Sequence, residues 1–265
     1  MGAFTVAALE DAGHEVSGFD LREGNDVLDR DALVDAADRC DAIVHLAAGA
    51  DTGTMDEAID ANTEGVHNVF AAAVRNGIGR VVMASSVRAL ACFPIEGELE
   101  YLPLDDDHPS RPRSAYSISK RIMERTAARA AQRHGLTVIC LRPPAVFSEE
   151  FIAALRDSTD TDESADWSPR RQYGGWIHGT DLGAAFARAL VCPAPAPGFA
   201  AVLVAADDSN SRLPVRELIR RTCPDVEWRG GPEYVDDPHR SLIISAAGRE
   251  LLGWAPKIRW RTTIE

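Results

Sequence analysis

The chain has 265 residues, 45% of them hydrophobic, with 28 Lys and Arg against 41 Asp and Glu. This length permits one large domain or two small ones, and the composition excludes wholesale disorder, collagen and coiled coil. The net charge of −13 argues against nucleic acid or an anionic membrane as a partner through a broad basic surface. No signal peptide and no apolar run of membrane-spanning length are found, so we expect a cytoplasmic protein.

The predicted elements alternate between helices and strands up to about residue 205. Helical patterns cover residues 2–13, 31–37, 55–75 and 114–134, the last one stopped by Gly135. Strand patterns cover residues 15–19, 42–46, 80–84 and 137–141, with a long loop over about 87–113. Such alternation indicates βαβ units, which require a parallel sheet with helices on both faces.

The pattern changes after Pro143-Pro144. Residues 157–171 are acidic and rich in Ser and Thr, which predicts a surface loop. A helix over 180–191, a strand over 201–205 and a short mixed tail follow. We expect an α/β, doubly wound domain over residues 1–145 and a small substrate-binding cap over residues 146–265 that is interleaved with the last sheet elements.

Cysteine and lysine are both informative. The five cysteines lie far apart, and neither a zinc-binding spacing nor a small disulfide framework fits them, so we expect no metal. Only two of the basic residues are lysines, Lys120 and Lys257. Because lysine is so rare in this sequence, we expect a functional role for a lysine that is retained. For Lys257 we accept that its presence is due to chance.

Lys120 belongs to the strongest chemical signal, Tyr116-Ser-Ile-Ser-Lys120. A spacing of four in a helix places the phenol and the ammonium on one face, about one turn apart. A cation near a phenol favours the phenolate, which suits a tyrosine to general acid–base work. Ser85-Ser86 follow a predicted strand, at the sheet edge where open parallel sheets bind ligands, and can hydrogen-bond the same substrate oxygen. The plain alternative is an amphipathic helix that merely presents Tyr and Lys.

The chain resembles the extended short-chain dehydrogenase/reductases, the NAD-dependent epimerase/dehydratase family. The matching stretches occur in the family's order and cover nearly the whole chain: 41–48, 62–68, 81–86, 116–120, 141–144, 176–181 and 251–254. The resemblance implies a Rossmann-type fold. It also implies that Tyr116 exchanges the substrate hydroxyl proton, that Lys120 binds the nicotinamide ribose, and that Ser86 orients the substrate oxygen. Ser85 is the competing serine.

The resemblance also implies which residues hold the cofactor. Asp20 matches a carboxylate that binds the adenosine ribose hydroxyls and repels a 2′-phosphate, which favours NAD over NADP, although Arg22 lies close by. The other matching positions, besides Tyr116 and Lys120, are Gly2, Asp26, Val27, Leu46, Ala47, Ala48, Asn62 and Pro143. A solvated Asp20, small core residues at Ala47 and Ala48, and an ordinary helix asparagine at Asn62 are the alternatives.

The family's G-x-x-G-x-x-G motif is incomplete here. Its backbone N–H groups hold the cofactor pyrophosphate between the first strand and the first helix, and Gly2 matches the last of its glycines. The first strand and two glycines are therefore missing. Either Met1 is an internal methionine of a longer product, which we favour, or the protein is damaged. As written, the chain is expected to bind NAD poorly.

The remaining polar residues give weaker signals. We expect His45 to be a core histidine, His178 and Asp181 to be structural, and Asp105-Asp106-Asp107 to be a solvated acidic turn. The short stretch between Pro144 and His178 favours a sugar or sugar acid over a nucleotide sugar. The sequence thus predicts an NAD-dependent oxidoreductase acting on a secondary alcohol or ketone. The alternatives are a nucleotide-sugar epimerase or dehydratase with retained NAD, and a non-catalytic cofactor sensor. Family resemblance also implies a homodimer.

Overall fold

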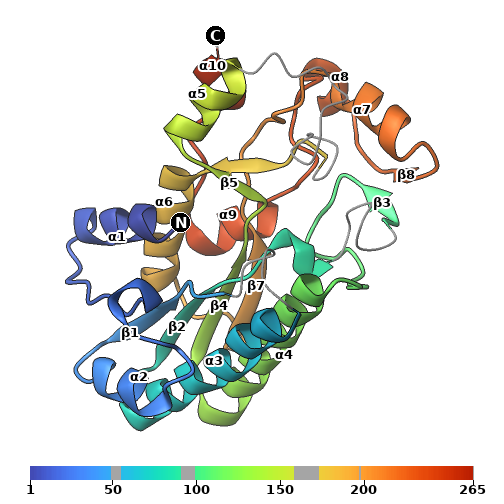
Figure 1. Ribbon diagram of the computed structural model, residues 1–265. Helices are drawn as coiled ribbons and strands as arrows, with labels where there is room; N and C mark the ends of the chain where they lie inside the picture. Colours follow the sequence, from blue (N-terminus) through green and yellow to red (C-terminus); the bar gives the residue numbers. More distant parts are fainter. Residues whose placement is uncertain (49–54, 91–98, 158–172, 197, 265) are drawn as a thin grey trace.

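The computed structural model describes residues 1–48, 55–90, 99–157, 173–196 and 198–264 (Figure 1). The centre of the molecule is a parallel four-stranded sheet with the order β1-β2-β4-β7. The strands are β1 (Ala42–His45), β2 (Arg80–Ala84), β4 (Thr137–Arg142) and β7 (Phe199–Leu203). Helices join the parallel strands, so the predicted α/β, doubly wound Rossmann-type fold is confirmed.

Helices cover both faces of this sheet, because successive strand side chains point to opposite sides. The buried strand residues on the face of α2 (Arg30–Ala36), α3 (Met55–Arg75) and α4 (Ala115–His134) are Val81, Met83, Val138 and Cys140. Those on the face of α6 (Gly179–Val191) and α9 (Ala246–Leu252) are Val82, Ala84, Ile139, Leu141 and Val202. The core therefore consists of two apolar layers, one on each side of the sheet.

Helix α1 (Gly2–Asp11) packs against α6 at very close range (Figure 1). A Cβ atom at Gly183 would overlap the carbonyl oxygen of Phe4, and one at Gly179 would overlap the Phe4 ring. Glycine at both positions is what allows the two helices to approach so closely.

Helix α4 carries the Tyr/Lys motif, and its ends follow local rules. Ser114 is the N-cap and forms a capping box with Ser117, which satisfies backbone N–H groups that the first turn leaves without helical partners. Gly135 ends the helix in the left-handed conformation, with φ of 69°. The cap fixes where the helix begins, and so places Tyr116 in its first turn.

The other elements lie mostly beyond the carboxyl ends of the central strands, in the upper half of Figure 1. Two parallel pairs form there, β5 (Ala145–Phe147) with β6 (Trp176–His178), and β3 (Tyr101–Leu102) with β8 (Glu227–Trp228). The helices of this part are η2 (Val87–Leu90), α5 (Glu149–Asp157), α7 (Val215–Thr222), α8 (Glu233–Asp236) and α10 (Trp260–Ile264). The division into two domains at residue 145 stays a prediction.

Two predictions about local structure are wrong. Residues 15–19 are not a strand, because among the described strands none lies beside them to form a ladder; the 3-10 helix η1 (Leu21–Glu23) follows. The predicted loop over 87–113 contains η2 and β3. Residues 158–171 of the predicted acidic loop lie outside the described residues.

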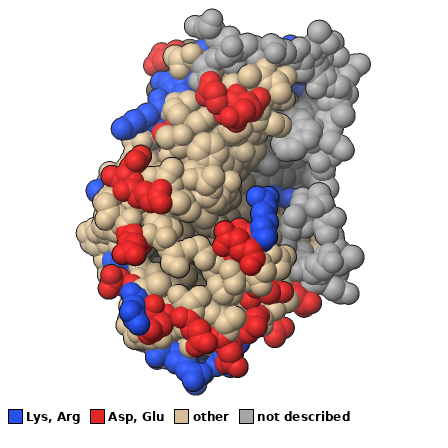
Figure 2. Space-filling model, turned by 60° about the vertical axis from the view of Figure 1, so that its left-hand side comes forward, with Lys and Arg blue, Asp and Glu red and all other residues tan. Residues whose placement is uncertain are grey.

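The described residues are characterised by their surface charge, their free cysteines and the absence of two classes of site. Acidic side chains are spread over the face seen in Figure 2. Cys40, Cys140, Cys192 and Cys223 are free thiols. Within the described ranges, no helix is long and apolar enough to cross a membrane, and no group of three His, Cys, Asp or Glu side chains is arranged to hold a metal ion.

Candidate active site

Lys120 joins helix α4 to the end of strand β2. Its side chain is almost fully buried, and Nζ donates a hydrogen bond of 2.8 Å to the carbonyl oxygen of Ala84. The same Nζ lies 5.7 Å from the centroid of the Tyr116 ring. Burial lowers the pKa of Lys120 to about 8, against the opposing charge of Glu124. The lysine thus holds the tyrosine helix against the strand that Ser85 and Ser86 follow.

The two serines have different hydrogen-bond partners. Ser85 is buried, and its hydroxyl donates to Glu124 Oε1 over 2.7 Å. Ser86 Oγ accepts a bond of 3.2 Å from the backbone N–H of Arg88. An accepted bond leaves the Ser86 hydroxyl hydrogen to be donated elsewhere, whereas the bond to Glu124 uses that of Ser85.

Arg88 is a neighbour of Tyr116 that the sequence analysis missed. The guanidinium carbon lies 4.7 Å from the centroid of the Tyr116 ring. Arg88 belongs to η2, which packs against α4 directly after Ser86. The contact joins segments 28 positions apart, so no local spacing could reveal it. Its only sequence signal is the place of Arg88 two residues after a candidate catalytic serine.

Ser85 contacts a buried network of charged side chains, which the sequence analysis also missed. Arg142 Nε and Nη2 donate to the two carboxylate oxygens of Glu124 over 2.8 and 2.9 Å. Burial raises the pKa of Glu124, but the hydrogen bonds and charge of Arg142 outweigh it, so the pKa lies below its ordinary value. Glu124 is one helical turn after Lys120, so this pair fixes the same helix to β4.

The network extends to Asp106, which corrects one prediction. Asp106 is not part of a solvated turn: it pairs with Arg142 Nη1 at 3.1 Å and accepts the backbone N–H of Leu203 at 2.9 Å. Burial raises the pKa of Asp106 to about 6, against the charge of Arg142. Asp105 accepts bonds from the Tyr101 hydroxyl and from the backbone N–H of Asp107. The acidic run is therefore a structural turn.

Asn62 reaches the tyrosine helix from α3. Its Nδ2 donates to Ser119 Oγ over 2.9 Å, and that hydroxyl donates to the carbonyl oxygen of Tyr116 over 2.8 Å. Asn62 is fully buried, and its Oδ1 has no hydrogen-bond partner. A buried acceptor without a partner is costly, so it marks a place where a donor fits.

Helix α3 also holds the loop around Asp26 and Val27. Asn68 Nδ2 donates to the carbonyl oxygens of Val27 and Leu28 over 3.1 and 3.2 Å. Gly65 lies directly beneath Val27, because a Cβ there would come within 2.8 Å of Val27 Cγ2. Asp26 Oδ1 accepts the backbone N–H of Leu28. Helix α3 therefore connects two groups of predicted residues, one in this loop and one on α4.

The remaining predicted cofactor residues are distributed as follows. Leu46, Ala47 and Ala48 directly follow β1, and Pro143 follows β4, with its carbonyl oxygen accepting the Val87 N–H. Because parallel strands end at the same edge of a sheet, these residues share an edge with Ser86. Asp20 is exposed and accepts the backbone N–H of Arg22 over 2.8 Å. Gly2 is the first residue of α1.

Three further polar residues have structural surroundings. His45 is buried, its Nε2 has no partner, and burial together with the charge of Lys120 lowers its pKa to about 3. His178 Nδ1 accepts the backbone N–H of Thr180 as the N-cap of α6. Asp181 Oδ2 accepts two backbone N–H groups near the C-terminal end.

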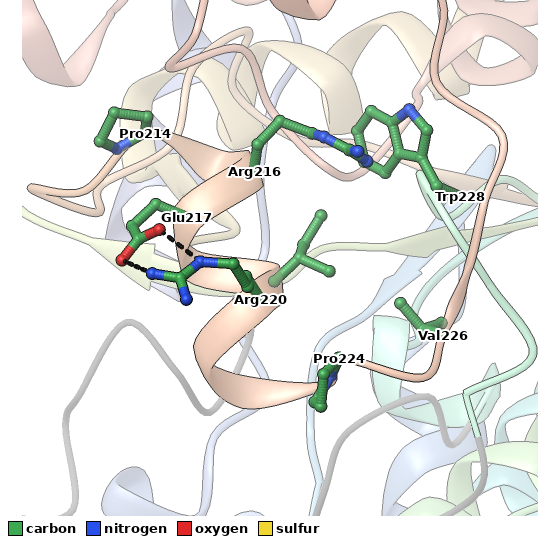
Figure 3. A pocket seen from close by; sticks show the side chains of 8 residues that line it. Pro214, Arg216, Glu217, Arg220, Pro224, Val226 and Trp228 are labelled. Atoms are coloured by element: carbon green, nitrogen blue, oxygen red, sulfur yellow. Dashed lines mark hydrogen bonds and ion pairs between the residues drawn. The ribbon is translucent and has the colours of Figure 1, made fainter.

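A surface pocket of about 560 Å³ lies between α7 and β8 (Figure 3). The Arg216 guanidinium lies 4.1 Å from the Trp228 ring centroid, and Glu217 pairs with Arg220. None of the predicted site residues lines this pocket. Its lining mixes charged and apolar side chains, and it lies outside the candidate site.

Comparison with known proteins identifies the family. The model of the NAD dependent epimerase/dehydratase family matches residues 1–200. The chain belongs to this family. It is therefore an enzyme of the NAD(P)-dependent oxidoreductase or epimerase type.

Similar proteins within the epimerase/dehydratase family include dehydrogenases. L-arabinose 1-dehydrogenase (NAD(P)(+)) of Haloferax volcanii is 30% identical over 225 residues, 79% of this chain and 86% of that protein. Uronate dehydrogenase of Pseudomonas syringae pv. tomato is 27% identical over 168 residues, 63% of this chain and 53% of that protein. A short-chain dehydrogenase/reductase superfamily protein from Agrobacterium tumefaciens, solved with bound NAD, has a TM-score of 0.72 at 22% identity and covers 99% of this chain and 91% of that one.

Proposed function

We propose that the protein oxidises a secondary alcohol of a sugar or sugar acid with NAD, or reduces the matching ketone. The observation that carries the proposal is the bond from Lys120 to Ala84, which brings a buried ammonium, the Tyr116 ring and the Ser86 hydroxyl to one edge of the sheet. The substrate class is taken from the similar proteins, which include an arabinose dehydrogenase and uronate dehydrogenases.

The residues at this edge fit the nicotinamide half of NAD. Small side chains at Ala47 and Ala48 permit close approach to the end of β1, and the buried Oδ1 of Asn62 lacks a donor. In the proposal, Lys120 holds the nicotinamide ribose and Pro143 borders the ring. The cofactor, when bound, supplies the ring that accepts or returns a hydride.

The proton steps belong to the chain itself. For oxidation, Ser86 donates a hydrogen bond to the substrate oxygen and Tyr116 Oη takes the hydroxyl proton as a general base. Lys120 favours the phenolate form that this step needs. For reduction the same groups act in reverse, and Tyr116 returns the proton. Ser85 is assigned a supporting role, since its hydroxyl is bonded to Glu124.

Cofactor choice and assembly are part of the same proposal. The exposed carboxylate of Asp20 supports NAD over NADP. A homodimer through α3 and α4 is supported by Val74 and Ile122 on these helices, which are 44% and 40% exposed. Light scattering coupled to size exclusion checks the dimer. We also propose that the enzyme acts in the cytoplasm.

The function is tested with the purified protein. Initial rates of NADH formation are measured with L-arabinose, uronates, other aldoses and simple secondary alcohols, each with NAD and with NADP. We expect one stoichiometric NADH per sugar oxidised, and its loss in Tyr116→Phe but not in the matched control Tyr101→Phe. Interconversion of UDP-glucose and UDP-galactose without NADH release would instead identify an epimerase, and no turnover with retained NAD binding would identify a sensor.

A further inference from the structure

The ring of Tyr116 contacts two cations from different elements. Lys120 comes from the same helix, α4, with Nζ 5.7 Å from the ring centroid. Arg88 comes from η2, with its guanidinium carbon 4.7 Å from the same centroid. The two cations differ in surroundings, because Lys120 is buried while Arg88 is partly exposed.

A cation this close to an aromatic ring interacts with the ring's electrons, and the useful range extends to about 6 Å from the centroid. When the phenol loses its proton, a full negative charge is delocalised over oxygen and ring, and the attraction to the cation increases. A guanidinium over the ring therefore stabilises the phenolate more than the phenol.

We propose that Arg88 is a second, permanently charged cation that stabilises the Tyr116 phenolate. Arg88 acts through Tyr116 and is thus a positioning residue. The inference rests on the proposed acid–base role of Tyr116 and adds to it a residue outside the Tyr/Lys motif.

The surroundings of Lys120 explain why a second cation is useful. Nζ faces His45 from β1, Glu124 from α4 and the Cys140 thiol from β4, and burial lowers the pKa of Lys120 to about 8. The lysine therefore loses its charge at moderately alkaline pH. An arginine keeps its charge throughout this range, so Arg88 supports the phenolate where Lys120 no longer can.

The geometry also ties Arg88 to the candidate serine. The Arg88 backbone N–H donates to Ser86 Oγ over 3.2 Å, and η2 packs against α4. The serine hydroxyl, the arginine and the tyrosine ring thus share one short segment and the helix that it contacts. Movement of η2 would displace Arg88, and with it the bond to Ser86, relative to the Tyr116 ring on α4.

The test observes the phenol directly and needs neither NAD nor substrate. Protein labelled with ¹³C at tyrosine Cζ is titrated by NMR, and the Tyr116 signal is assigned as the one absent in Tyr116→Phe. In Arg88→Met we expect its titration midpoint to rise by about 0.5–1.5 pH units. Arg88→Lys is expected to restore at least half of this shift. An unchanged midpoint in Arg88→Met would overturn the proposal.

A matched control is available on α7. Arg216 lies over the Trp228 ring in the same kind of contact, outside the candidate site (Figure 3). Arg216→Met should leave the Tyr116 midpoint unchanged, and an equal shift in this variant would overturn the proposal by showing a general effect of lost charge. Circular dichroism checks each fold, and Arg88→Gln replaces Arg88→Met if the latter does not fold.

The pH profile of kcat/KM gives a second readout. With whichever sugar the wild type oxidises, the limb that reports Tyr116 should move to higher pH in Arg88→Met by the same interval as in the NMR titration. If the NMR midpoint shifts but Tyr116→Phe remains active, the proposed function fails and the effect of Arg88 stands. If Tyr116→Phe is inactive and the midpoint does not shift, the function stands and the inference about Arg88 fails.

Discussion

Removal of the Arg142 guanidinium should destabilise the fold strongly. Glu124 is 2% exposed and receives bonds of 2.8 and 2.9 Å from Arg142 and 2.7 Å from Ser85. Arg142→Met keeps an unbranched side chain but leaves the buried carboxylate with only Ser85 and Arg121 as partners. Loss of one partner of a buried ion pair costs about 3–5 kcal/mol, because the other charge stays buried with less compensation. For a chain of this size, that lowers Tm by about 6–20 °C.

Urea unfolding and differential scanning calorimetry at pH about 7 measure this loss. The matched control is Arg220→Met, which removes an equally bidentate pair with Glu217 at the surface and should change the stability far less, because solvent screens this pair. A double variant, Glu124→Met with Arg142→Met, should recover part of the loss, since neither charge remains buried. If Arg142→Met were as stable as Arg220→Met, the argument that Glu124 is charged and dependent on Arg142 would be wrong.

Four further predictions concern packing, pH and salt. Gly183→Ala should cost about 1–3 kcal/mol in urea unfolding, because the added Cβ overlaps the Phe4 carbonyl oxygen, whereas Gly2→Ala meets no atom within 4 Å and should be neutral. Burial lowers the pKa of His45 from 6.5 to about 3, so between these pH values only the unfolded chain binds a proton at this residue. The free energy of unfolding therefore falls as pH drops through this range, and His45→Phe should remove this dependence. Burial raises the pKa of Asp106 from 3.8 to about 6, so between these pH values the folded chain binds the proton more tightly than the unfolded chain. The free energy of unfolding therefore falls as pH rises through this range, and Asp106→Asn should remove this dependence. With a net charge of −13, Tm should rise as KCl increases to about 1 M, and a Tm independent of salt would contradict self-repulsion as a major cost.

Local signals predicted the elements that form the candidate site. The helix over 114–134 follows from a serine cap, an apolar periodicity and a terminal glycine, all of which act within a few residues. The strand over 80–84 matches β2 residue for residue, because it is a short apolar run bounded by polar residues. The order of helices and strands then fixes which residues lie at the carboxyl edge of the sheet.

Contacts between distant segments could not be predicted in this way. The strand expected over 15–19 fails because a strand needs a neighbour, which is a property of the whole fold. Glu124 and Arg142 are 18 positions apart and pair only because α4 crosses β4. Glu124 of this pair accepts the hydrogen bond from the Ser85 hydroxyl, whereas Ser86 Oγ accepts a bond from Arg88. This difference separates the two candidate serines, which the sequence alone could not do.

The central claim is that Tyr116 moves the substrate proton while NAD exchanges the hydride. It is tested most directly with a sugar substrate deuterated at the carbon that is oxidised, followed by mass spectrometry of the NADH formed by wild type and Tyr116→Phe. The account predicts one deuterium per NADH from the wild type, and a rate about 10²–10⁴-fold lower in Tyr116→Phe with NAD affinity preserved. NADH without deuterium, or a Tyr116→Phe variant that transfers deuterium at the wild-type rate, would contradict it.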